Sequence, residues 1–91
     1  DVKKFPNLAL AYNALEKGGN MPCILNAANE VAVGAFLREQ IPFTGMPHII
    51  EKCMEMTAFI PDPGLADYIE TDTQARKVAE MIVNKQRHSM L

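Results

Sequence analysis

Asn26, Asn29 and Glu30 are the residues whose types and spacing could support chemistry. Their separation of i, i+3 and i+4 places all three on one face of a helix, and we call this set the polar seam. In a catalytic role, Glu30 would be a metal ligand or general base and the two amides would orient a substrate. One carboxylate with two amides is a poor site for a hard cation, because Mg²⁺ usually takes one or two carboxylates plus oxygens of its substrate. The pattern favours a structural role in which the seam bonds to a neighbouring segment, since one buried unsatisfied group would cost about 1–3 kcal/mol.

The histidines and cysteines do not combine into a second site. His48 and His88 have no further ligand at the spacing of a zinc site, and we expect His48 to face solvent or to cap a helix. Cys23 and Cys53 lie on apolar helical faces without a nearby base, so we expect reduced, buried thiols, which fits a cytosolic compartment. No glycine-rich phosphate loop is present. The sequence therefore predicts no catalytic, cofactor-binding or metal-binding residue in this chain.

The polar seam belongs to a long apolar stretch, residues 20–38, that predicts a single helix. Asn20 is a suitable N-cap, and Pro22 suits the first turn, where its missing N–H costs little. Arg38 lies at the far end, where a cation interacts favourably with the helix dipole. The apolar side chains point nearly all round the axis, which is typical of a helix enclosed by neighbours. We expect this to be the central, buried helix of the fold.

A first helix is predicted over about residues 7–17, with Asn7 as its cap or Pro6 in its first turn. Gly18 and Gly19 end it, because glycine adopts the left-handed cap conformation without steric cost. The short connection predicts an antiparallel hairpin with the central helix. An apolar stripe at helical spacing is expected to face the core: Leu8, Ala11, Tyr12 and Leu15.

Pro42 interrupts the chain after the central helix, and Ile41 and Phe43 on either side of it are expected to anchor this loop. Thr44 is the expected cap of a third helix, which ends where prolines and a glycine follow, at residues 60–64. The inward face of this helix is predicted from its apolar periodicity: Met46, Ile49, Ile50, Cys53 and Thr57.

The last helix is expected to begin with Thr71 or Asp72 as its cap. The preceding residues 65–71 fit either one helical turn or a short extended piece. Arg76 lies near the expected helix start, where a cation is unfavourable, so we expect it to pair with Asp72 or with a carboxylate on another segment. The core face recurs at helical spacing: Ala75, Val78, Ala79, Ile82 and Val83.

Composition and length agree with one small all-α domain over residues 1–91, a four-helix bundle-like fold around a central buried helix. The chain has 91 residues, of which 48% are hydrophobic and 22% charged, which is ordinary globular composition. The net charge of −2 argues against a dedicated nucleic-acid-binding domain, and no apolar run approaches the ~20 residues that cross a bilayer. The chain begins with Asp1 rather than Met, as a processed protein or a fragment of a longer one would.

Five groups of residues, in order along the chain, give this sequence its resemblance to a known family. The most specific is the run from Leu25 to Val33, LNAANEVAV, followed by Ala35-Phe36-Leu37. The others are Phe5-Pro6 with Leu8-Ala9-Leu10-Ala11; Gly18-Gly19; Ile41, Phe43 and Thr44; and Asp72 with Ala75-Arg76 and Ala79. Together they span about residues 5–83, and the chain resembles the C-terminal domain of the 1-deoxy-D-xylulose 5-phosphate reductoisomerase family.

The resemblance implies a three-domain parent enzyme with an NADPH-binding domain, a central catalytic domain and a C-terminal helical bundle. Such enzymes rearrange and reduce 1-deoxy-D-xylulose 5-phosphate to 2-C-methyl-D-erythritol 4-phosphate with NADPH and Mg²⁺ or Mn²⁺, in non-mevalonate isoprenoid biosynthesis. The family's metal-binding and phosphate-binding residues lie in the central domain, so none is carried onto this chain. The resemblance also implies a homodimeric parent in the bacterial cytoplasm or a plastid.

Two other functions are compatible with the residues alone. A free-standing helical module would bind a partner through an apolar groove. A small metal-dependent enzyme would use Glu30. On the favoured interpretation, the domain braces the catalytic domain, the polar seam fixes a neighbouring loop, and the chain by itself is inactive.

Overall fold

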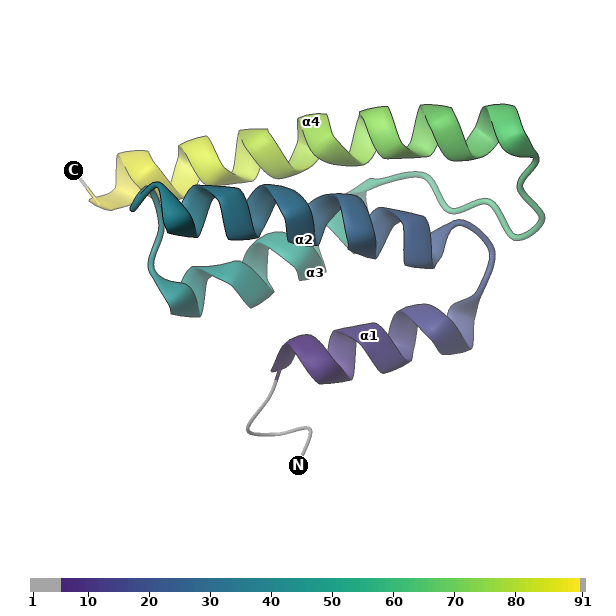
Figure 1. Ribbon diagram of the computed structural model, residues 1–91, viewed down its shortest axis with the longest axis horizontal. Helices are drawn as coiled ribbons and strands as arrows, with labels where there is room; N and C mark the ends of the chain where they lie inside the picture. Colours follow the sequence, from purple (N-terminus) through teal and green to yellow (C-terminus); the bar gives the residue numbers. More distant parts are fainter. Residues whose placement is uncertain (1–5, 91) are drawn as a thin grey trace.

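Four helices build the described part of this computed structural model, which comprises residues 6–90, with side chains described over 6–88. In chain order they are α1 (Pro6–Lys17), α2 (Met21–Leu37), α3 (Met46–Met56) and α4 (Leu65–Met90), with a 3₁₀ turn, η1 (Phe43–Gly45), before α3. No strand occurs between residues 6 and 90, so the predicted all-α bundle is confirmed (Figure 1). None of these helices is long and apolar enough to span a bilayer. Phe5, which contributes to the resemblance, lies outside the described residues.

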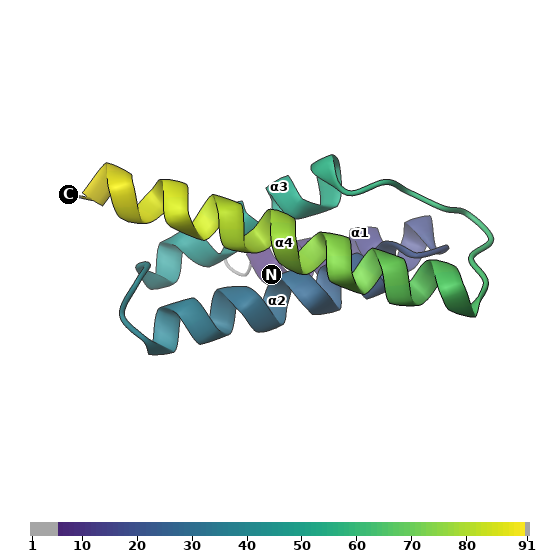
Figure 2. The ribbon, with the colours of Figure 1, turned by 90° about the horizontal axis from the view of Figure 1, so that it is seen from above.

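The second helix is the centre of the bundle, because α1, α3 and α4 all pack against it. Figures 1 and 2 show α2 and α4 side by side, with α1 on the opposite side of α2 from α4. The predicted central helix is therefore confirmed. Its enclosure is less complete than expected, because the apolar side chains of Val33 and Leu37 are exposed as well as the polar seam. Its buried side chains are Met21, Ile24, Ala27, Ala28, Val31, Ala32 and Ala35.

The core faces predicted for the third and last helices are confirmed, with Val78 partly buried and the rest buried. Ile41 is also buried, as expected of a loop anchor. Phe43 is 66% exposed, although its ring packs edge-to-face with that of Phe36 at a centroid distance of 5.6 Å, so its prediction as a buried anchor was wrong. Thr44 does not cap α3, because it lies within the 3₁₀ turn and Gly45 takes the cap position.

The first helix runs antiparallel to α2 and ends at Gly18 and Gly19, whose φ angles are +70° and +57°, as predicted (Figure 1). Its expected core stripe was wrong: Leu8, Tyr12 and Leu15 are 43%, 59% and 70% exposed. The turn packs directly on residues 59–61, because a Cβ on Gly19 would overlap the Ile60 carbonyl oxygen and lie 2.9 Å from the Pro61 Cα. The residues of α1 that face the core are instead Leu10 and Ala14.

The last helix begins at Leu65, so Thr71 and Asp72 lie inside α4 and do not cap it. The sequence analysis left residues 65–71 open between a helical turn and an extended piece, and the structure shows that they are helical and continuous with α4. The helix start is stabilised by Asp67, whose Oδ2 accepts a 2.9 Å hydrogen bond from the Gly64 N–H. A side chain at the third helical position that accepts from the preceding N–H is one half of a capping box.

Candidate functional site

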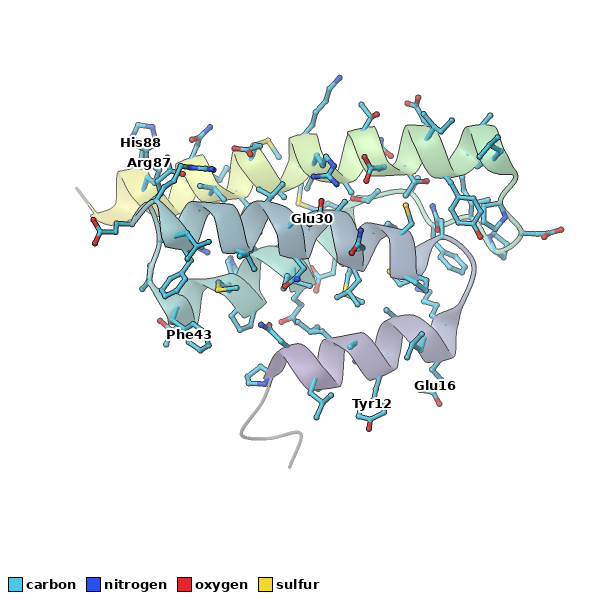
Figure 3. The ribbon with its side chains drawn as sticks, viewed as in Figure 1. Tyr12, Glu16, Glu30, Phe43, Arg87 and His88 are labelled. Carbon is cyan, nitrogen blue, oxygen red and sulfur yellow. The ribbon has the colours of Figure 1, made fainter. Side chains whose placement is uncertain are left out.

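The polar seam lies on the surface of α2, and all three of its side chains are exposed. Glu30 points toward α4 (Figure 3) and forms an ion pair with Arg76 of that helix. Asn26 and Asn29 lie one turn and one residue before Glu30 on the same helix. The seam therefore connects two helices through one carboxylate and presents two amides to the surface.

Arg76 lies between two carboxylates. Its Nε donates to Asp72 Oδ2 at 2.9 Å, one turn earlier on α4, and its Nη2 donates to Glu30 across the helix interface. These hydrogen bonds, to Asp72 first and then to Glu30, raise the pKa of Arg76. The pairing expected from the sequence is confirmed. Side chains in both pairs are about 40–55% exposed, and such pairs typically contribute about 0.2–1 kcal/mol.

A buried polar residue, Asn20, was missed as an organising group by the sequence analysis. It is fully buried and occupies the N-cap position of α2, as predicted, but its side chain makes no capping hydrogen bond to this helix. Its Nδ2 donates to the Ala58 carbonyl and to Thr71 Oγ1, both at 2.9 Å, and its Oδ1 accepts from the Ile60 N–H at 2.8 Å. We call Asn20 with these three partners the Asn20 clasp. It joins the start of α2 to the segment after α3 and to α4.

Both cysteines are free thiols, as predicted. Cys53 is buried and donates to the Ala75 carbonyl at 3.2 Å, and burial raises the pKa of its thiol. Cys23 is half-buried and donates to the Tyr68 carbonyl at 3.7 Å; burial, followed by the Asp72 carboxylate, raises its pKa. Because nucleophilic cysteines act as thiolates, which a raised pKa disfavours, neither thiol has the environment of a catalytic residue.

A cavity of about 430 Å³ lies between α3 and α4. It combines cationic side chains with an apolar floor and has no carboxylate in its lining: Pro42, His48, Lys52, Met56, Ile82, Lys85 and Gln86. His48 is exposed, and His88 is exposed near the far end of α4 (Figure 3). The lining of this cavity therefore offers His48 no carboxylate with which to form an acid–base pair.

Metal-ligating side chains are not clustered among the described residues. Over the part of the chain that the structure describes, no group of three or more His, Cys, Asp or Glu side chains is placed to hold a metal. The carboxylate of the seam, Glu30, is instead engaged by a guanidinium. In the one glycine pair of the sequence, Gly19 packs against the backbone of residues 60–61, whereas the Cβ position of Gly18 is open.

These features define a class of protein: a small all-α domain whose buried amide, Asn20, and ion pair, Glu30–Arg76, join its own elements. The chain belongs to the family of the DXP reductoisomerase C-terminal domain, whose model matches residues 1–78. A 1-deoxy-D-xylulose 5-phosphate reductoisomerase of Bacteroides thetaiotaomicron is 57% identical over 83 residues, which is 91% of this chain and 21% of that protein. The enzyme of the same name from Acetivibrio thermocellus is 53% identical over 83 residues, or 91% of this chain and 22% of that protein.

A solved structure agrees with this assignment. The 1-deoxy-D-xylulose 5-phosphate reductoisomerase of Zymomonas mobilis, in complex with NADPH, superposes with a TM-score of 0.84 at 36% identity. The match covers 91% of this chain and 22% of that one. The chain thus spans about a fifth of the length of the relatives it matches.

Proposed function

We propose that this chain is the C-terminal domain of an enzyme that converts 1-deoxy-D-xylulose 5-phosphate to 2-C-methyl-D-erythritol 4-phosphate with NADPH and Mg²⁺ or Mn²⁺, in isoprenoid biosynthesis. The observation that carries the proposal is the 57% identity, over nearly the whole chain, to a reductoisomerase of that name. The bound NADPH of the Zymomonas mobilis relative supports the choice of cofactor. The parent enzyme acts as a homodimer in the cytoplasm of a bacterium, or in a plastid.

Within this enzyme the domain, residues 1–91, supplies no catalytic, NADPH-binding or metal-binding residue and braces the catalytic domain. A single hydrophobic core that includes residues from every described α-helix supports treating the chain as one rigid unit. The polar seam contributes in two ways: Glu30 holds α4 through Arg76, and the exposed amides of Asn26 and Asn29 bond to a neighbouring loop of the catalytic domain.

A free-standing interaction module is the less favoured function, because the relatives carry this sequence as about a fifth of a longer chain. The test compares two proteins in one assay. We expect the purified 91-residue chain not to oxidise NADPH in the presence of the sugar phosphate and Mg²⁺, and the full-length enzyme to do so. Turnover by the short chain alone would contradict the proposal, as would a full-length protein that leaves the sugar phosphate unchanged.

A further inference from the structure

The first helix directs its most apolar row away from the bundle. Leu8, Tyr12 and Leu15 occupy that row, and each is exposed. The residues of α1 that pack against the rest of the domain are Leu10, which is partly buried, and Ala14, which is fully buried. Figure 3 shows Tyr12 pointing away from α2 and α3, with the Glu16 carboxylate beside it. Exposed apolar surface of this kind is typical of an interaction site, especially with a polar rim.

The size of this face favours a partner that is covalently connected to it. A stable interface between separate molecules usually takes about 800 Å² and 20–30 residues from each side, which three large side chains do not supply. A partner in the same chain is present at an effective concentration of about millimolar, so a much smaller contact is sufficient. The relatives provide such a partner, because about four-fifths of their length lies outside the region that matches this C-terminal domain.

We propose that the α1 face, defined as Leu8, Tyr12 and Leu15, docks the preceding part of the same full-length chain. This inference rests on the proposed function, in which the domain belongs to a longer enzyme. The docked surface has an apolar hollow for the three side chains and a basic residue at its rim for the Glu16 carboxylate, which is exposed beside Tyr12.

Hydroxyl-radical footprinting with mass spectrometry tests this inference. Oxidation of Tyr12 and Leu15 is measured in the 91-residue chain and in the full-length enzyme, with Tyr68 as a tyrosine control on α4. We expect Tyr12 to react about tenfold more slowly in the full-length enzyme, because burial removes most of the 59% of its surface that is exposed in this domain. Tyr68, 41% exposed, should react at similar rates in both proteins.

A variant pair makes the test specific. In the full-length enzyme, Leu15→Glu should restore Tyr12 oxidation to nearly the rate of the short chain, whereas Leu65→Glu, at an exposed leucine on α4, should not.

Equal Tyr12 oxidation in the two unsubstituted proteins would overturn the inference. Two concentration effects would also overturn it: loss of Tyr12 protection when the full-length enzyme is diluted, or Tyr12 protection in the short chain that increases with its concentration. Either result would show that a second copy of the chain covers this face. Protection of Tyr12 in a full-length protein without reductoisomerase activity would support the docking surface and contradict the proposed function.

Discussion

At the scale of single residues, the Asn20 clasp uses both donors and one acceptor of a fully buried amide. A buried polar group is strongly destabilising when its partners are lost, because each orphaned group keeps its desolvation cost. The three bonds satisfy the Ala58 carbonyl, the Ile60 N–H and the Thr71 hydroxyl, which belong to two other segments of the chain. Polar side chains of this kind determine how elements meet, whereas the exposed ion pairs of Arg76 contribute little.

We predict that Asn20→Ala lowers the free energy of unfolding by about 1–3 kcal/mol, because it leaves buried partners unsatisfied. Urea denaturation followed by circular dichroism measures this change. The matched control is Asn29→Ala, at an exposed position of the same helix, which should change the stability of the short chain by less than about 0.5 kcal/mol. Similar losses for the two variants would contradict the assigned importance of the clasp.

The sequence could not identify the clasp, because its partners lie 38 to 51 residues away and local patterns report only on neighbours. An asparagine just before an apolar helix predicts an N-cap, in which the side-chain amide would accept a hydrogen bond from the first turn of its own helix. Arg76 was easier, since Asp72 is four residues away on the same helix. The role of Asn26 and Asn29 stays a prediction.

At the scale of elements, periodicity located the helices well and their orientations less well. The faces of α3 and of the second half of α4 were correct because one row of large apolar residues meets the core there. The apolar stripe on α1 has the same spacing. Spacing alone cannot distinguish a helix face that packs into the domain's own core from one that is exposed on its surface. The start of α4 was placed too late, at Thr71 or Asp72, because both are typical N-cap residues, whereas the side chain that caps this helix is Asp67, inside its first turn.

The cap gives a prediction for α4. Asp67→Ala should remove the acceptor for the Gly64 N–H and destabilise the first turn by about 1 kcal/mol. Amide hydrogen exchange should then become faster over residues 65–70 and stay unchanged over residues 75–83, where the helix packs on the core. Asp62→Ala, in the exposed loop before the helix, serves as the control. Uniform acceleration along α4 would show that the helix opens as one unit and would contradict a local effect.

At the scale of the whole molecule, the Asn20 clasp and the Glu30–Arg76 pair connect elements of the domain to one another, and the chemistry proposed for the parent enzyme is assigned to its other domains. The domain is flattened, with principal extents of 41, 30 and 18 Å. A thin body of this kind has a large surface relative to its core. That surface suits a part whose function is to pack against another.

Residues 6–88 contain no cluster of metal-ligating side chains, which leads to a prediction about metal ions. Mg²⁺ or Mn²⁺ should leave the unfolding midpoint of the 91-residue chain unchanged, because Glu30 is engaged by Arg76. A site filled at 100 times its dissociation constant would instead add about 2.7 kcal/mol. Thermal denaturation with added metal, and with chelator as the reference, distinguishes the two. A stabilisation that Glu30→Gln abolishes would favour the small metal-dependent enzyme.

The long reach of the Asn20 clasp has a consequence for the lifetime of the folded domain. Its hydrogen bonds close loops of 38, 40 and 51 residues, so they form only after the helices that they join have come together. Contacts made after the folding transition state affect mainly the unfolding rate. Stopped-flow measurements on Asn20→Ala should therefore show unfolding accelerated roughly 5–30-fold for one or two kcal/mol lost, with refolding nearly unchanged. We therefore expect the clasp to determine mainly how slowly the domain unfolds, and so how long each molecule stays folded.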